Sequence, residues 1–175
     1  MRYLVCSLLA LATPLAAEVR STSDIGFAVE KTVTVQASPA QVFAALTKPS
    51  LWWNSAHSWS GDARNLTLDL RAGGCFCERL PKVRGEVEHA RVVHLVPDQM
   101  LRLSGALGPL QGEAVTGTLT WTLKRDGDKT VITQSYVVGG YLRQGAKTLS
   151  GPVDGVLSEQ LTRLAAYIDS RKTRP

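Results

Sequence analysis

Residues 33–43, VTVQASPAQVF, join the end of a strand to the start of a helix. Apolar and polar residues alternate over residues 27–35, which predicts a strand with one buried face. Ser38 is a suitable N-cap, Pro39 fits the first helical position, and Gln41 can reach back to complete a capping box. The sequence therefore predicts a strand followed at once by a capped helix.

About six strands are expected after this helix, separated by turns that contain glycine or polar residues. Their predicted ranges are residues 64–70, 75–80, 85–96, 100–103, 116–124 and 130–138. Residues 105–112 are rich in glycine and are expected to form a flexible connection or a lid. Alternation is weakest over residues 85–96.

The last segment changes period, because apolar residues recur every three or four positions from Leu149 to Ile168. This predicts an amphipathic helix over residues 152–170. Gly151, Pro152 and Gly155 weaken its start, so the helix either begins near Pro152 or is bent there. The order of elements predicts an α+β helix-grip fold, in which a curved antiparallel sheet of about six or seven strands wraps around the long C-terminal helix.

The N-terminus has the order of features of a secretory signal. Arg2 precedes an apolar run over residues 4–11, and small residues at 15–17 offer a cleavage site. The run is too short to span a bilayer, and no later stretch is apolar enough to do so. Residues 1–17 are therefore predicted to be a signal peptide, and the mature protein to be periplasmic or secreted.

Removing 17 of the 175 residues leaves a length that suits a single domain. The expected division is a polar lead-in at 18–26, one domain at 27–171 and a tail at 172–175. The net charge of +5 is spread along the chain, and no basic stripe with interleaved aromatic residues is present. Nucleic acid is therefore not an expected partner.

The chain resembles the START-like, or SRPBCC helix-grip, superfamily. The resemblance rests on residues 33–43, on Trp52-Trp53, on the Gly-Gly hairpin DLRAGGCFCE at 69–78, and on the final helix at 161–168. The branch that the chain most resembles is that of activators of a heat-shock chaperone ATPase, grouped with polyketide cyclase-like proteins. The resemblance implies a ligand cavity between sheet and last helix. A chaperone is not an expected partner, because an exported chain would not meet one.

Glu78 is the most prominent polar candidate. The family often has an acidic residue at this place, which the resemblance implies points toward the cavity or its rim. There Glu78 could anchor a polar ligand group or act as an acid or base. The alternative is a strand carboxylate paired with an arginine such as Arg64 or Arg79.

Cys75 and Cys77 depart from the family pattern. In a regular strand their Cα atoms would lie about 6.6 Å apart, near the upper limit for a disulfide. Two packed thiols, a local disulfide that distorts the strand, and a soft metal site completed by His89 or His94 all remain open. No metal site and no cofactor are assigned.

An apolar cavity would need aromatic and aliphatic walls, and several residues could supply them. His57, beside Trp59, is the second acid–base candidate, although spacing fixes no partner for it. The candidate ligand-binding residues are Trp52, Trp53, Trp59, Phe76, Glu78, Trp121, Tyr136, Leu157, Leu161 and Leu164.

Three functions fit these features. The first is a carrier of an apolar or amphipathic small molecule. The second is a cyclase- or hydrolase-type enzyme without a cofactor, which would use Glu78 or His57 in the same cavity. The third is a structural or partner-binding protein whose cavity is filled by side chains.

Overall fold

The capped helix predicted from residues 33–43 is present in the computed structural model, which describes residues 18–172. Helix α1 spans Pro39–Leu46, and both hydrogen bonds of the Ser38–Gln41 capping box are formed. Its buried face consists of Val42, Phe43, Ala45 and Leu46. The predicted signal peptide at 1–17 and nearly all of the predicted tail lie outside the described residues.

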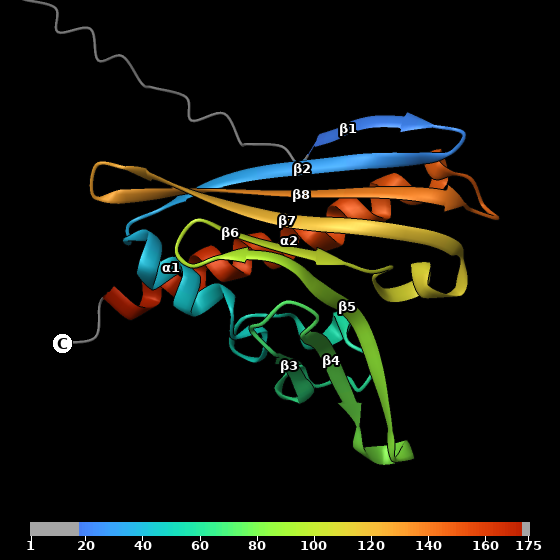
Figure 1. Cartoon of the computed structure of the whole chain (residues 1–175), viewed down its shortest axis with the longest axis horizontal. Helices are drawn as coiled ribbons and strands as arrows, with labels where there is room; N and C mark the ends of the chain where they lie inside the picture. The colour runs from blue at the N-terminus through green and yellow to red at the C-terminus, as the bar shows by residue number, and fades with distance from the viewer. Residues whose placement is uncertain (1–17, 173–175) are drawn as a thin grey trace, which may run out of the picture.

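Eight strands form one antiparallel sheet in the order β1-β2-β8-β7-β6-β5-β4-β3. The strands are β1 (Glu18–Ser23), β2 (Gly26–Val35), β3 (Leu66–Leu68), β4 (Cys75–Leu80), β5 (Gly85–Val96), β6 (Met100–Ser104), β7 (Ala114–Asp126) and β8 (Lys129–Tyr141). The sheet is curved, and β4 and β5 extend away from the rest as a long hairpin (Figure 1).

The predicted helix-grip fold is confirmed, with one strand more than expected. The extra strand is β1, which lies in the segment predicted to be a loose lead-in. Its backbone pairs with β2 from Glu18↔Glu30 to Ser23↔Gly26. The polar composition that suggested a lead-in also suits an edge strand, whose outer side faces solvent.

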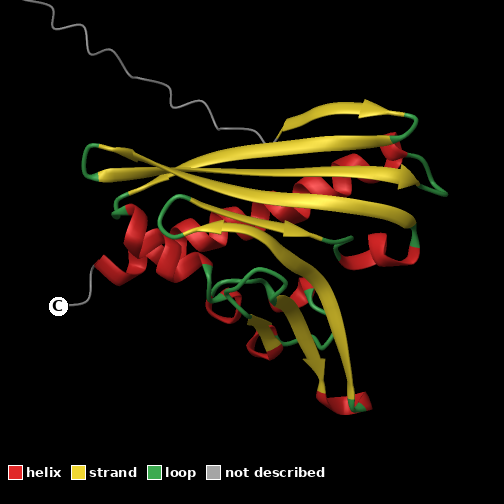
Figure 2. Ribbon diagram, in the orientation of Figure 1, coloured by secondary structure: helices red, strands yellow, loops and turns green. Residues whose placement is uncertain are grey.

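Helix α2 spans Ala146–Lys172 and lies along one face of the sheet (Figures 1 and 2). It begins six residues before Pro152, which lies inside it, so the predicted start near Pro152 is wrong. Pro152 is the seventh residue of α2, beyond the four initial positions whose N–H groups have no partner within a helix, so it removes one backbone hydrogen bond from a helix of 27 residues. None of the helices within residues 18–172 is both long and apolar enough to cross a membrane.

Short 3-10 helices fill the connections. They are η1 (Pro49–Leu51), η2 (Ser55–His57), η3 (Ala63–Asn65), η4 (Pro81–Val83) and η5 (Gly108–Gly112). The main core lies between α2 and the central strands, where Leu161 and Leu164 of α2 are fully buried with Ile132 and Tyr136 of β8. Toward the start of α2 this packing opens into a cavity.

Candidate functional site

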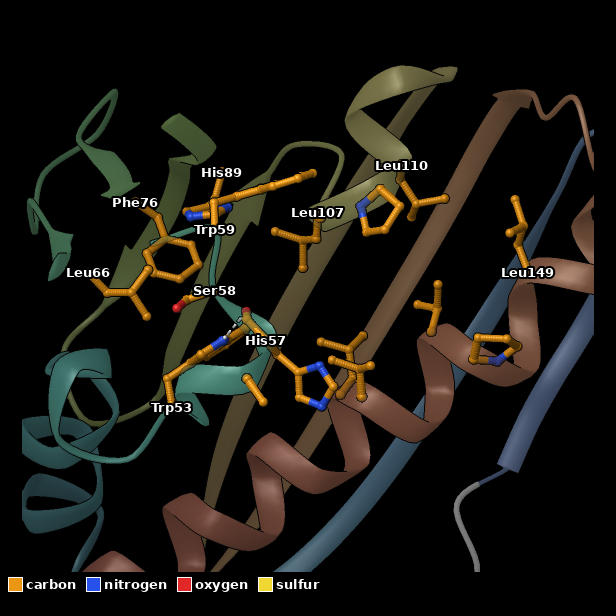
Figure 3. A pocket seen from close by; sticks show the side chains of 17 residues that line it. Trp53, His57, Ser58, Trp59, Leu66, Phe76, His89, Leu107, Leu110 and Leu149 are labelled. Carbon is orange, nitrogen blue, oxygen red and sulfur yellow. Dashed lines mark hydrogen bonds between the residues drawn. The ribbon is translucent and has the colours of Figure 1, made fainter. Parts of the chain in front are cut away.

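A cavity of about 450 Å³ lies between the first half of α2, η5, strands β3 to β5 and the loop that follows α1 (Figure 3). Its lining is mostly apolar. The residues that line it are Trp53, Ala56, His57, Ser58, Trp59, Leu66, Phe76, His89, Leu107, Gly108, Pro109, Leu110, Leu149, Pro152, Val153, Val156 and Leu157. The cavity is in the size range of small-molecule pockets, about 300–1,000 Å³.

The two ends of this pocket differ in chemistry. Trp53, Phe76 and His89 form a continuous aromatic group, with ring centroids 5.7 Å apart for the first pair and 5.1 Å apart for the second. Trp59 joins them at the pocket surface and is 54% exposed. The other end, between α2 and η5, is aliphatic, with side chains such as Leu110 and Val153.

Five of the predicted residues line the pocket, namely Trp53, His57, Trp59, Phe76 and Leu157. Of these, His57 and Trp59 are exposed and border the opening of the pocket. The other predicted residues do not line it. They are Trp52, Glu78, Trp121, Tyr136, Leu161 and Leu164.

Trp52 and Trp121 belong to the core. The Trp52 indole donates to the carbonyl oxygen of Ala45 at 3.1 Å, which fixes the ring beneath α1. The Trp121 indole donates to Gln134 Oε1 at 2.8 Å, and Gln134 donates in turn to the carbonyl oxygen of Leu157 at 2.9 Å. Both indoles are therefore held in place by hydrogen bonds that tie neighbouring elements together.

Leu161 and Leu164 are predicted ligand-binding residues, but they do not line the pocket, so this prediction is wrong. Both are fully buried against the central strands. The helix wall comes from earlier turns of α2, at Leu149, Val153 and Val156. Periodicity identifies the apolar face of a helix but does not say which part of it faces a void.

Tyr136 supports the pocket without lining it. Its hydroxyl donates to the carbonyl oxygen of Gly105 at 2.9 Å and accepts from the Leu107 amide at 3.1 Å. A Cβ on Gly117 would lie 2.3 Å from this hydroxyl oxygen, so only glycine allows the ring to reach the connection. Burial raises the pKa of Tyr136 to about 12, so the hydroxyl keeps its proton. Tyr136 therefore anchors residues 105–112, which include η5.

Glu78 lies behind the pocket and is fully buried. Its Oε1 accepts from the Ser60 amide at 2.6 Å, and its Oε2 accepts from the Trp59 amide at 3.1 Å. Oε2 also lies 3.0 Å from His89 Nε2. The predicted pairing with Arg64 or Arg79 is wrong, because Arg64 binds Asp62 and the inward face of β4 meets His89.

His89 reaches the pocket because β5 contains a β-bulge. Phe76 pairs with Ala90 and Cys77 with Glu88, which leaves His89 as an extra residue in β5. The bulge interrupts alternation, so His89 and Ala90 are both buried although they are adjacent. This explains the weak alternation of residues 85–96, which is the one signal in the sequence that could have pointed to His89.

The protonation states of Glu78 and His89 follow from their surroundings. Burial raises the pKa of Glu78, but hydrogen bonds from Ser60, Trp59 and His89 together outweigh it and bring the pKa below its usual value. Burial lowers the pKa of His89, and its interactions with Glu78 only partly oppose this. Near neutral pH, Glu78 is therefore ionised and His89 is neutral, with its proton on Nε2.

His57 has a carboxylate partner that its sequence neighbours did not reveal. Its Nε2 lies 3.0 Å from Glu159 Oε2 on α2. Glu159 also accepts from the Asn54 side-chain amide, and this bond, together with His57, keeps the pKa of Glu159 below its usual value. The pair joins the η2 segment to α2 at the opening of the pocket.

Cys75 and Cys77 form a disulfide, so the packed-thiol interpretation is wrong. Their Cα atoms are 5.4 Å apart, closer than in a regular strand, and the distortion coincides with the bulge opposite. Both cysteines are on the face of β4 opposite Phe76 and Glu78. Within residues 18–172 no three His, Cys, Asp or Glu side chains gather in a way that could hold a metal ion.

Comparison with known proteins identifies the protein family of this chain. The family model for polyketide cyclase / dehydrase and lipid transport matches residues 26–169, so the chain belongs to this family. No curated protein sequence matches the chain.

Several solved structures share the fold. Protein MLL2253 from Mesorhizobium loti has a TM-score of 0.60 and 17% identity, over 85% of this chain and 99% of its own. Mll3558 from Rhizobium loti has a TM-score of 0.57 and 26% identity, and the match covers 82% of this chain and 97% of Mll3558. CalU16 from Micromonospora echinospora has a TM-score of 0.55 and 16% identity, and the match covers 87% of this chain and 84% of CalU16.

Proposed function

We propose that this protein is exported and carries an apolar or amphipathic small molecule in the pocket beside the first half of α2. The observation that carries the proposal is the pocket of about 450 Å³ with a largely apolar lining. Burial of apolar ligand surface would supply most of the binding free energy, at about 25 cal/mol per Å² before the costs of association. Export rests on the signal-like residues 1–17.

The proposal can be tested with an apolar fluorescent probe such as N-phenyl-1-naphthylamine. Val156 lines the pocket, so Val156→Trp would fill it, whereas Val137→Trp places the same side chain on the exposed outer face of β8. We expect saturable binding to the wild type and to Val137→Trp, and an affinity at least about tenfold lower for Val156→Trp. Equal binding by both variants would place the probe elsewhere and refute the proposal.

A cyclase- or hydrolase-type enzyme that uses the same pocket is the second candidate. One observation favours it, the pairing of His57 with Glu159 at the opening, because a carboxylate that orients a histidine is a common arrangement for acid–base chemistry. Glu78 is a weaker candidate, since both of its oxygens are occupied and it is outside the pocket lining. If the protein is an enzyme, His57→Gln removes turnover and leaves probe affinity within about twofold.

A further inference from the structure

The pocket contains one buried polar group that is fixed in position, the imidazole of His89. Its Nε2 is held by Glu78, and Glu78 is held by the amides of Trp59 and Ser60. This chain of contacts joins β5, β4 and the loop after α1. The ring also packs on Phe76, so neither its position nor its tautomer is free to change.

The other ring nitrogen, Nδ1, is available. Because Glu78 takes the Nε2 proton, Nδ1 of the neutral ring carries a lone pair and can only accept a hydrogen bond. No residue within 18–172 donates to it, while the ring borders the pocket. An acceptor on a side chain that lines the pocket, with no donor among residues 18–172, is a binding point for a donor on the ligand.

The surroundings of this acceptor are aromatic. Phe76 packs on His89 and on Trp53, and Trp59 lines the same end of the pocket (Figure 3). Aromatic side chains favour offset or edge-to-face contact with another ring. A ligand that suits both the aromatic side chains and the His89 acceptor has an aromatic ring at this end of the pocket and a hydrogen-bond donor on that ring.

We propose that the pocket selects a hydroxylated aromatic compound, with its ring among Trp53, Trp59 and Phe76 and its hydroxyl donating to His89 Nδ1. The inference rests on the proposed carrier function and specifies its ligand class. His89 is the specificity-determining residue, and Glu78 is a positioning residue that acts through it. Any apolar remainder of the ligand would lie along the aliphatic side chains of α2 and η5.

Three related compounds test this proposal by calorimetry near neutral pH, namely 2-naphthol, 2-methoxynaphthalene and naphthalene. The last two lack the donor but keep the fused rings. We expect the wild type to bind 2-naphthol about five- to tenfold more tightly than 2-methoxynaphthalene. His89→Phe keeps a ring of similar size and should abolish the preference. His94→Phe makes the same change at an exposed position of β5 and should preserve it.

The outcomes separate the two proposals. Equal affinity for all three compounds in the wild type, or a preference that survives in His89→Phe, overturns the assignment of His89 and leaves the carrier function intact. No binding of any of the three overturns both. If His89→Phe does not fold, ¹⁵N NMR of the histidine-labelled wild type decides. The Nδ1 resonance of His89 should move on addition of 2-naphthol and not of naphthalene, and movement with both or neither contradicts the assignment.

Discussion

Glu78 connects three segments of the chain beside the pocket. It is fully buried, yet its carboxylate accepts three hydrogen bonds from residues 59, 60 and 89. Two of the donors are backbone amides, which stabilise the charged form. The carboxylate therefore joins the loop after α1 to the β4–β5 hairpin.

Replacement of Glu78 by glutamine should destabilise the fold. The glutamine side chain is nearly the same size, but it is uncharged and has only one acceptor atom, so at least one of the buried donors loses its partner. We expect the free energy of unfolding to fall by about 1–3 kcal/mol in urea titrations. Glu86→Gln, at an exposed position of β5, should change it by less than about 0.5 kcal/mol. Equal effects of the two substitutions would show that the buried contacts are not important for stability.

The connection between β6 and β7 is the element that closes one side of the pocket. Residues 107–110 line the pocket, and the Tyr136 hydroxyl bonds to the backbone at Gly105 and Leu107. The position of η5 therefore depends on a side chain from β8. The glycine-rich sequence allows the chain to turn here but does not fix its place.

Tyr136→Phe should loosen this connection and leave the sheet intact. The phenyl ring fills the same space, but the Gly105 carbonyl and the Leu107 amide lose their partner. We expect faster hydrogen exchange at residues 105–112 and a loss of about 1–3 kcal/mol of unfolding free energy. Tyr141→Phe removes a hydroxyl from an exposed side chain and is the matched control. Unchanged exchange in Tyr136→Phe would contradict the anchoring role.

The pH dependence of stability is a property of the domain as a whole, and the Glu78–His89 pair should contribute to it. The pKa of His89 is lower in the folded protein than its usual value, so the unfolded chain binds this proton first as the pH falls below about 6.5. Stability is therefore lost from there down to the folded pKa. Glu78, the titratable group that faces His89, has a lowered pKa, and its contribution disappears at lower pH, below about 4.5.

Urea titrations between about pH 5 and 7 can measure the His89 contribution. His89→Gln places an amide donor near the position of Nε2 but does not titrate, so its stability should fall less steeply with decreasing pH than that of the wild type. His94→Gln should follow the wild type more closely. An identical slope in His89→Gln and the wild type would rule out the protonation of His89 as a source of the dependence.

Local patterns account for the architecture. Alternation and turn residues predicted seven of the eight strands, the Ser38–Gln41 box placed the start of α1, and the period of three to four residues predicted the final helix. These features depend on contacts within a few residues of each other, so a single sequence displays them. The general position of the pocket, between sheet and last helix, followed from the family resemblance.

The identity of the pocket residues depended on contacts between segments far apart in the chain. The bulge that turns His89 inward depends on the register between β4 and β5, and the partners of Glu78 come from residues 59 and 60. Leu157 borders the cavity while Leu161, one turn later, is in the core, although both belong to the same apolar stripe. Hydrophobic patterning records that a side chain avoids water. Whether it meets another side chain or an open space is decided only when the distant segments pack together.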